Sequence, residues 1–278
     1  MKTETLTTTS PTAGDHTLGR PRRSFYRRHE ALILGGGAVL VVLVIWQAFW
    51  SAGMIRPLFF TGPSAIAQRF YITLTNGTLL ANIGYSGRNF LLGFAMSVVA
   101  GVVLGVLIGW YRWLRLLTDP FVNALYATPR IALIPLIIIW FGADIWSKVV
   151  IIFLSGVFPI LVNTVVGIKA LDRDLLRAAR SFRASDWQIF RTIAVPGSVP
   201  FILAGVRQGV AHALIGVVVG EMLAGSPQGI GFMISYSGYN FSLDSLFLYV
   251  AVVAGAGILL TSLVERLQAR FERWRPER

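Results

Sequence analysis

Cysteine is absent from the 278 residues, and charged residues are scarce. Without cysteine, the chain forms neither disulfides nor thiolate metal sites, and it has no cysteine nucleophile. Its three histidines, His16, His29 and His212, are too widely spaced for a metal cluster. Only 14% of the residues are charged, whereas about a quarter are in an ordinary soluble domain. Together with a mean hydropathy of +0.66, this shortage of charge excludes a soluble domain, a disordered chain and a small secreted scaffold.

Motifs of known catalytic chemistry are also missing. The sequence has no G-x-x-x-x-G-K-[S/T] phosphate loop and no H-E-x-x-H zinc motif. The segment Gly225-Ser226-Pro227-Gln228-Gly229 resembles a serine elbow only loosely, because that motif needs Ser at its third position. We therefore expect no catalytic residue, metal site or cofactor in this chain, and a membrane enzyme finds no support.

Long apolar runs are the main feature that the sequence does have. A bilayer core is about 30 Å thick, so a helix of about 20 apolar residues spans it. Six such runs predict an all-α, polytopic membrane protein with six transmembrane helices. They cover residues 31–50, 88–110, 120–141, 147–167, 199–223 and 246–264.

The positive charge predicts the orientation of these spans. The net charge is +12, and nineteen of the 25 Lys and Arg residues lie in the two tails and in the connectors around 111–118 and 169–191. The alternate connectors hold only Arg56, Arg69 and Lys148. Because basic residues gather in cytoplasmic loops, we expect both termini in the cytoplasm. The charge therefore indicates membrane orientation, and we expect no nucleic-acid partner.

Three regions follow from this pattern. Residues 1–29 are polar and poor in large apolar side chains, which predicts a disordered basic cytoplasmic tail. Residues 30–265 form the six-helix membrane domain, including a long cytoplasmic connector at 169–198. Residues 266–278 form a charged cytoplasmic tail. Residues 64–74, between turn signals, predict a short amphipathic helix at the outer interface.

Glycines recur at every fourth position in two of the spans. This spacing lets helix backbones approach closely where lipid provides no hydrophobic drive. We interpret the glycines as packing positions rather than as a solute path. They are Gly101, Gly105 and Gly109 in the second span, and Gly205, Gly209, Gly216 and Gly220 in the fifth.

Polar groups inside the spans are candidates for a solute or ion pathway, because a charge in the membrane needs a partner or a wet cavity. Glu221 and Arg207 lie 14 residues apart in one span, about 21 Å along a helix, so they cannot pair within it. Glu221 is either an ion or proton site, or it caps backbone and pairs across helices. Arg130 and Asn163 are further candidates, and Arg130, like Arg88, either attracts an anion entering the pore or is tied to a helix end.

The connector at 169–198 carries two short amphipathic stripes. Leu175, Leu176, Ala179 and Phe182 fall on one helical face. Ser185 then predicts an N-cap, and a second stripe follows it. Two short helices joined at an angle would form a protruding knob. Such a knob fits a groove on a partner protein, or it lies on the membrane surface.

This segment resembles the cytoplasmic loop of permease subunits from ATP-binding-cassette (ABC) importers. The family pattern is matched at full spacing by Arg177-Ala178-Ala179, Arg183, Ile193 and Val195-Pro196. Flanking segments, among them Ile131–Leu136, Trp140–Gly142 and Gly229–Gly231, are similar to the sulfonate, taurine and nitrate branch. The resemblance covers about residues 60–270.

Two residues depart from the family pattern. Arg177 stands where the family has Glu, and Arg183 stands where it has Gly, at the bend between the two short helices. Glycine permits a positive φ, which costs a residue with a Cβ roughly 1 kcal/mol or more. Either the bend is made differently here, or Arg183 contacts a partner with an acidic surface.

The resemblance implies a bacterial inner-membrane pore of the type I ABC importer permease fold for a small solute such as a sulfonate, taurine or nitrate. It implies a homodimer with two separate ATPase subunits, which hold ATP and Mg, and an extracytoplasmic substrate-binding protein. The alternative is an ion-coupled secondary transporter that uses Glu221. The residues implied to contact the ATPase are Leu176, Arg177, Ala178, Ala179, Phe182, Arg183, Ile193 and Pro196.

Overall fold

The computed structural model describes residues 25–54, 59–225 and 227–272, and in this part of the chain every regular element is a helix. The chain divides into two units, residues 1–48 and 49–278. Of the first unit, the structure describes most of α1 (Phe25–Ser51), whose segment Leu34–Ser51 is apolar enough to cross a membrane. The predicted tails fall largely outside the described residues, although α1 has begun by Phe25 and α11 continues to Glu272.

The second unit contains most of the membrane-spanning helices. Long apolar helices are α3 (Thr78–Trp110), α6 (Ile145–Lys169), α9 (Val195–Leu223) and α11 (Leu243–Glu272). Counting α1, five described helices are long and apolar enough to cross a membrane, and a bent pair makes a sixth. The all-α polytopic fold is therefore confirmed.

Helix α3 begins ten residues earlier than the sequence predicts. Its N-cap is Gly77, whose φ of +77° is in the left-handed region, where glycine is least strained. The side chain of Asn76 also accepts a hydrogen bond from the Thr78 N–H at 3.0 Å. The added turns contain polar residues, so a hydropathy pattern places the helix start too late.

The third predicted span, 120–141, is wrong as a continuous helix. The chain forms α4 (Arg112–Ala127), a short 3₁₀ turn (Arg130–Leu133) and α5 (Ile134–Phe141), with a bend of 90° between the two halves. Thr128 and Pro129 lie at the break. Proline forces the residue before it away from helical dihedrals and provides no N–H of its own, and Thr128 accordingly has an extended ψ of 129°.

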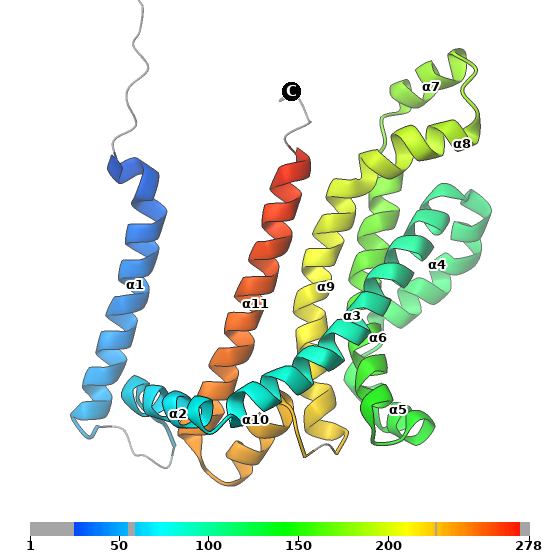
Figure 1. Cartoon of the computed structure of the whole chain (residues 1–278). Helices are drawn as coiled ribbons and strands as arrows, with labels where there is room; N and C mark the ends of the chain where they lie inside the picture. Colours follow the sequence, from blue (N-terminus) through cyan, green and yellow to red (C-terminus); the bar gives the residue numbers. More distant parts are fainter. Residues whose placement is uncertain (1–24, 55–58, 226, 273–278) are drawn as a thin grey trace, which may run out of the picture. The chain divides into compact units, whose positions relative to one another are not determined.

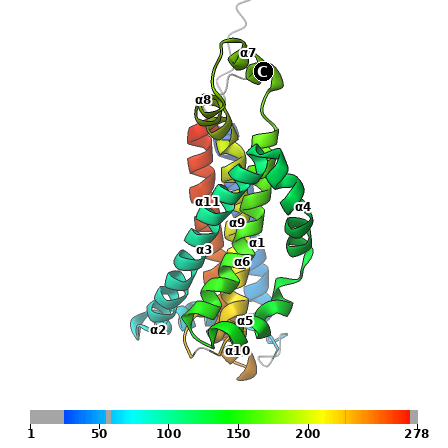
Figure 2. The same cartoon turned by 90° about the vertical axis from the view of Figure 1, so that its right-hand side faces the viewer.

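Two short helices complete the unit. The predicted amphipathic helix at 64–74 is confirmed as α2 (Pro63–Thr75). A second helix, α10 (Ile230–Tyr239), lies between the last two spans, where the sequence analysis places only a connector. Figure 1 and Figure 2 show α2, α5 and α10 at one end of the unit, and the connector at 169–198 with the end of α11 at the opposite end.

Close backbone packing of α3 against α6 forms the centre of the unit. A Cβ placed on Gly101 would lie 2.9 Å from the Ile160 side chain, and one on Gly105 would lie 2.6 Å from the Cβ of Thr164. Side chains cannot fit at such distances, so only glycine permits this approach. Gly205, Gly209 and Gly216 of α9 meet α6 in the same way. The packing role predicted for these glycines is confirmed.

Candidate functional site

The long connector folds into two short helices that project from one end of the unit. They are α7 (Arg173–Ser181) and α8 (Asp186–Ile189), and we call residues 173–189 the knob. Asp172 caps α7, because its carboxylate accepts a hydrogen bond from the Asp174 N–H at 2.8 Å. Figure 1 shows both helices at the end of the unit that also holds the end of α11.

The bend of the knob lies at Arg183, whose φ is +57°. The N–H of Arg183 donates to the Arg180 carbonyl at 2.9 Å, and the N–H of Ala184 donates to the Ala179 carbonyl at 3.1 Å. These two bonds are the Schellman pattern that ends helices with a left-handed residue, which is usually glycine. The chain therefore makes at Arg183 the left-handed turn that glycine usually makes.

Ser185 is the N-cap of the second knob helix, as the sequence predicts, and it forms a capping box with Gln188. The Gln188 N–H donates to the Ser185 hydroxyl at 3.3 Å, and the Ser185 N–H donates to the Gln188 side-chain oxygen at 2.8 Å. Helix α8 then continues through a π-helical turn (Phe190–Ala194) into α9, so that residues 186–223 form one 38-residue helical segment. The knob is thus joined to a spanning helix without a loop between them.

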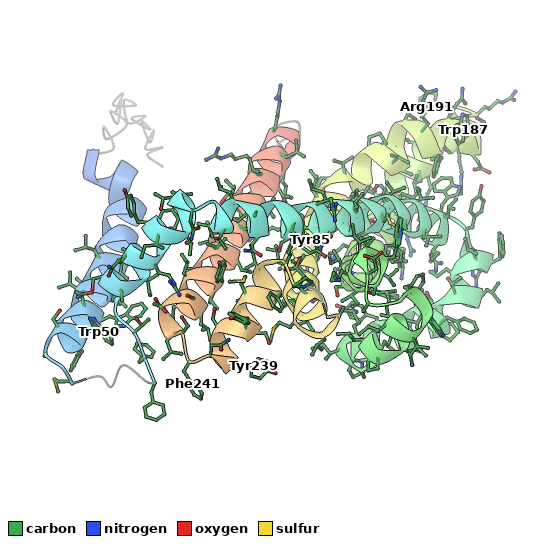
Figure 3. All side chains as sticks on the ribbon, turned by 60° about the horizontal axis from the view of Figure 1, so that its bottom comes forward. Trp50, Tyr85, Trp187, Arg191, Tyr239 and Phe241 are labelled. Carbon is green, nitrogen blue, oxygen red and sulfur yellow. The ribbon has the colours of Figure 1, made fainter. Side chains whose placement is uncertain are left out.

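Aromatic side chains are exposed on the knob. Phe182 is 88% exposed and Trp187 is 66% exposed, although both are large apolar residues. Figure 3 shows Trp187 and Arg191 at the end of the unit, away from the labelled Tyr239 and Phe241. Exposed aromatics beside charged residues mark protein contact sites. The side chains of Phe182 and Trp187 therefore provide a surface that suits a protein partner.

The base of the knob is fixed to the membrane helices by partly buried aromatic contacts. Ile189 is buried, and the Phe190 ring contacts the Trp110 ring of α3 edge to face at 5.2 Å between centroids. Phe190 also stacks on Trp187 at 5.5 Å. The base of the knob is therefore in contact with α3 and continuous with α9.

The remaining predicted contact residues surround these aromatics. Arg177, which lies 3.5 Å from Asp174 in a solvent-exposed ion pair, contributes little to stability at that exposure. Leu176, Ala179 and Ile193 are half-buried, whereas Arg177, Ala178, Arg183 and Pro196 are exposed. The structure thus brings the eight residues to one end of the molecule, with Ile193 and Pro196 at the base.

Glu221 lies in a fully buried polar cluster at the other end of α9. Its carboxylate accepts hydrogen bonds from the Ser86 hydroxyl at 2.8 Å, the Asn89 amide at 3.1 Å and the Gly231 N–H at 3.0 Å. Lys148 is also buried and donates to the Asp144 carbonyl at 3.1 Å. The three hydrogen bonds from Ser86, Asn89 and Gly231 compensate the Glu221 carboxylate for its loss of water on burial.

The same cluster caps the start of α10. The Gly229 N–H donates to Asn82 and the Ile230 N–H donates to Ser86, both at 2.8 Å. Together with the bond from Gly231 to Glu221, three orphan N–H groups of a helix start are satisfied. A negative charge at a helix N-terminus is also favoured by the helix dipole. Glu221 therefore caps the backbone of α10 and accepts hydrogen bonds across from α3.

The partners of Glu221 in α3 were not among the predicted site residues. Asn82, Ser86 and Asn89 are spaced four and three residues apart, which places them on one face of a helix. This polar stripe is the signal that could have identified them. The helix that they cap, α10, was also missed because its ten residues are too few for a membrane span.

Asn163 and Arg207 lie together in an open groove between α6, α9 and α11. The Asn163 amide donates to the Gln208 side chain at 3.0 Å, and Arg207 pairs with Glu265 at 2.9 Å. The groove has a volume of about 550 Å³, and its other lining residues are Ala204, Ala211, Thr261 and Gln268. Glu221 and Arg130 are not among its lining residues.

Arg130 follows the break in the third span and has no acceptor among the described residues. Its guanidinium carbon lies 5.7 Å from the Tyr126 ring centroid and 5.6 Å from that of Phe158, and its Nε is buried without a hydrogen bond. A charge at mid-membrane costs about 2.5–3.5 kcal/mol on insertion scales. A desolvated cation–π contact recovers about 2 kcal/mol, but it leaves the N–H donors unsatisfied.

Comparisons with known proteins identify the family. The model of the binding-protein-dependent transport system inner membrane component matches residues 97–275. The putative aliphatic sulfonates transport permease protein SsuC of Bacillus subtilis is 30% identical over 99% of this chain and 98% of its own length. The riboflavin transport system permease protein RibX of Chloroflexus aurantiacus is 35% identical over 91% of this chain and 95% of its own length. The taurine transport system permease protein TauC of Escherichia coli is 28% identical over 87% of this chain and 89% of its own length.

A solved structure shares the fold. A chain of the inward-facing MetNI methionine ABC transporter matches with a TM-score of 0.62 and 15% identity, over 70% of this chain and 96% of that chain. At this identity the match shows the fold alone, and it agrees with the permease fold expected from the sequence. The comparisons support an ABC permease and not an ion-coupled secondary transporter that uses Glu221. The chain belongs to the family of inner membrane components of binding-protein-dependent transport systems.

Proposed function

We propose that the chain is the pore-forming permease subunit of an ATP-driven ABC importer for a small solute. The observation that carries this proposal is the exposed, capped knob at residues 173–189, which is joined directly to α9. A second copy of the chain completes the pore. Two separate ATPase subunits bind ATP and Mg below it, and a substrate-binding protein docks from outside.

The knob transmits the motion of the ATPase to the pore. Its exposed Phe182 and Trp187 enter a cleft of the ATPase subunit, and its base is packed against Trp110 of α3. When ATP closes the ATPase pair, the two knobs approach each other. Because α8 continues into α9 without a loop, this approach tilts α9 and opens the pore outward.

The opposite end of the unit receives the binding protein. Tyr239 is 84% exposed and Phe241 is 65% exposed there, at the C-terminal end of α10. Figure 3 shows both side chains pointing away from the helices. With the knob in the cytoplasm, both chain termini are cytoplasmic too, as the distribution of basic residues predicts.

The transported solute is a small anion such as a sulfonate. This proposal is supported by two relatives, which are named as permeases for aliphatic sulfonates and for taurine. A third relative is named for riboflavin, so members of the family differ in solute. ATP hydrolysis takes place in the separate ATPase subunits.

A pair of charged substitutions in the knob tests the ATPase contact. Burying an aromatic side chain contributes about 1.5–3 kcal/mol, so Ala179→Asp with Phe182→Asp should weaken ATPase binding by roughly 10- to 100-fold. The measurement is the amount of ATPase subunit that co-purifies with tagged permease in detergent.

Tyr239→Asp is the matched control, because Tyr239 is equally exposed at the other end. It should leave ATPase co-purification unchanged. Size-exclusion profiles of all variants check that the membrane helices stay folded. Normal ATPase binding by a correctly folded double variant would refute the docking assignment.

A further inference from the structure

Arg130 is a half-buried cation for which the described part of the chain provides no hydrogen-bond acceptor. Its guanidinium lies within 6 Å of two aromatic rings, those of Tyr126 in α4 and Phe158 in α6. Its Nε is buried and makes no hydrogen bond. The two rings contact the cation, and no acceptor in the described part of the chain takes its N–H groups.

Three other cations of the second unit have oxygen acceptors within the chain. Arg207 pairs with Glu265, and Lys148 donates to the Asp144 carbonyl. Arg69 donates to Ser245 at 2.6 Å and lies 3.4 Å from Asp244. Arg130 differs from these three because the chain provides rings for it instead of oxygens. Its acceptor therefore comes from outside the described residues.

The backbone beside Arg130 indicates that this place is not covered by lipid. Thr128 and Pro129 interrupt the span immediately before Arg130, with a 90° bend. Irregular backbone at membrane depth occurs only where protein or a water-filled cavity covers it. Helix α4 has no buried residue of its own in this chain, and Figure 2 shows it to one side of α3 and α6. This side is therefore closed by a second subunit, by water or by both.

We propose that Arg130 lies on the translocation pathway and binds the anionic group of the solute in transit. This inference rests on the proposed function, because it needs a pore between two copies of the chain. A guanidinium fork matches the planar arrangement of two oxygens on a sulfonate or carboxylate. Tyr126 and Phe158 orient the fork, so Arg130 selects anionic solutes over neutral solutes of similar size.

The test uses the complete transporter, with its ATPase and binding protein, in proteoliposomes. The solutes supplied are ethanesulfonate, nitrate and riboflavin, of which the first two are anions and the third is neutral. The wild-type transporter should take up at least one anion. Arg130→Gln should lower that uptake about tenfold or more, because a charge-assisted hydrogen bond is lost. Arg130→Lys should give an intermediate rate, since it keeps the charge without the fork.

Arg88→Gln is the control. Arg88 is exposed and lies 5.6 Å from the Tyr85 ring, so its substitution should leave anion uptake unchanged. ATP hydrolysis stimulated by the loaded binding protein should stay within about twofold of wild type for both Gln variants. This readout separates a solute-binding role from a structural one, which would lower ATP hydrolysis as well.

Several results would overturn the inference. Normal anion uptake by Arg130→Gln, an equal loss in Arg88→Gln, or a parallel loss of stimulated ATP hydrolysis would each do so. Uptake of riboflavin alone by the wild type would contradict the proposed preference for anionic solutes while leaving the importer function intact. A wild-type complex that hydrolyses ATP but takes up no solute would instead refute the proposed function itself.

Discussion

Replacing one glycine in α3 tests how closely the membrane helices pack. In Gly105→Ala, the new Cβ would lie 2.6 Å from the Thr164 Cβ and 2.9 Å from the Leu161 carbonyl oxygen. These neighbours are a branched side chain and backbone, which move only with the helix. Overpacking of this kind costs about 1–3 kcal/mol, while alanine recovers up to about 1 kcal/mol of helix propensity.

Gly84→Ala is the matched control in the same helix. No atom lies within 4 Å of the position that its Cβ would take, so only the propensity gain acts. In a chain of this size, each kcal/mol shifts the melting temperature by roughly 2–4 °C. Thermal unfolding in detergent should show a lower melting temperature for Gly105→Ala and an unchanged or higher one for Gly84→Ala. Equal melting temperatures would refute the close α3–α6 packing.

Three further changes test separate parts of the structure. Glu221→Leu leaves the Gly231 N–H unpaired and should destabilise the protein by about 1–3 kcal/mol, whereas Glu221→Gln should cost less; equal unfolding temperatures for the two would contradict the capping role. Arg183→Gly should stabilise the knob by roughly 1 kcal/mol, seen as slower amide exchange at the bend, and faster exchange would count against it. Arg207→Ala should cost at most about 1 kcal/mol, because its pair with Glu265 is half exposed; a double-mutant cycle that gives a much larger coupling energy would show a buried role.

Local signals predicted several elements correctly. Turn residues on both sides identified α2, and the Ser185 position identified the start of α8, because caps depend on neighbours only three residues away. The fourfold spacing of Gly101 and Gly105 predicted their packing, since the period of a helix places them on one face. These features depend on short stretches of chain, which a sequence displays directly.

Features that depend on distant residues could not be predicted. The partners of Glu221 lie 132 and 135 positions away, and no local pattern connects them to it. The break at Pro129 was hidden because the residues around it are apolar on both sides, and hydropathy does not report backbone direction. A proline does not by itself predict a helix break, since Pro159 and Pro200 lie inside continuous helices.

The surroundings of Arg130 also could not be predicted. From the sequence, an arginine near a span edge is equally consistent with an anion site and with a bond to a helix end. The structure adds two ring contacts and a buried Nε without a hydrogen bond. The rings come from residues 4 positions before and 28 positions after Arg130, and no local pattern connects the more distant one to it.

The most direct test of the central claim is to purify the tagged protein in mild detergent from its native membrane and identify its partners by mass spectrometry. The proposed function predicts a second copy of the chain and an ATP-binding-cassette ATPase subunit at about one per permease. It also predicts that the knob variant with Ala179→Asp and Phe182→Asp loses the ATPase while keeping the second copy. A stable assembly of this chain alone, under conditions in which other ABC importers retain their ATPase subunits, would contradict the account.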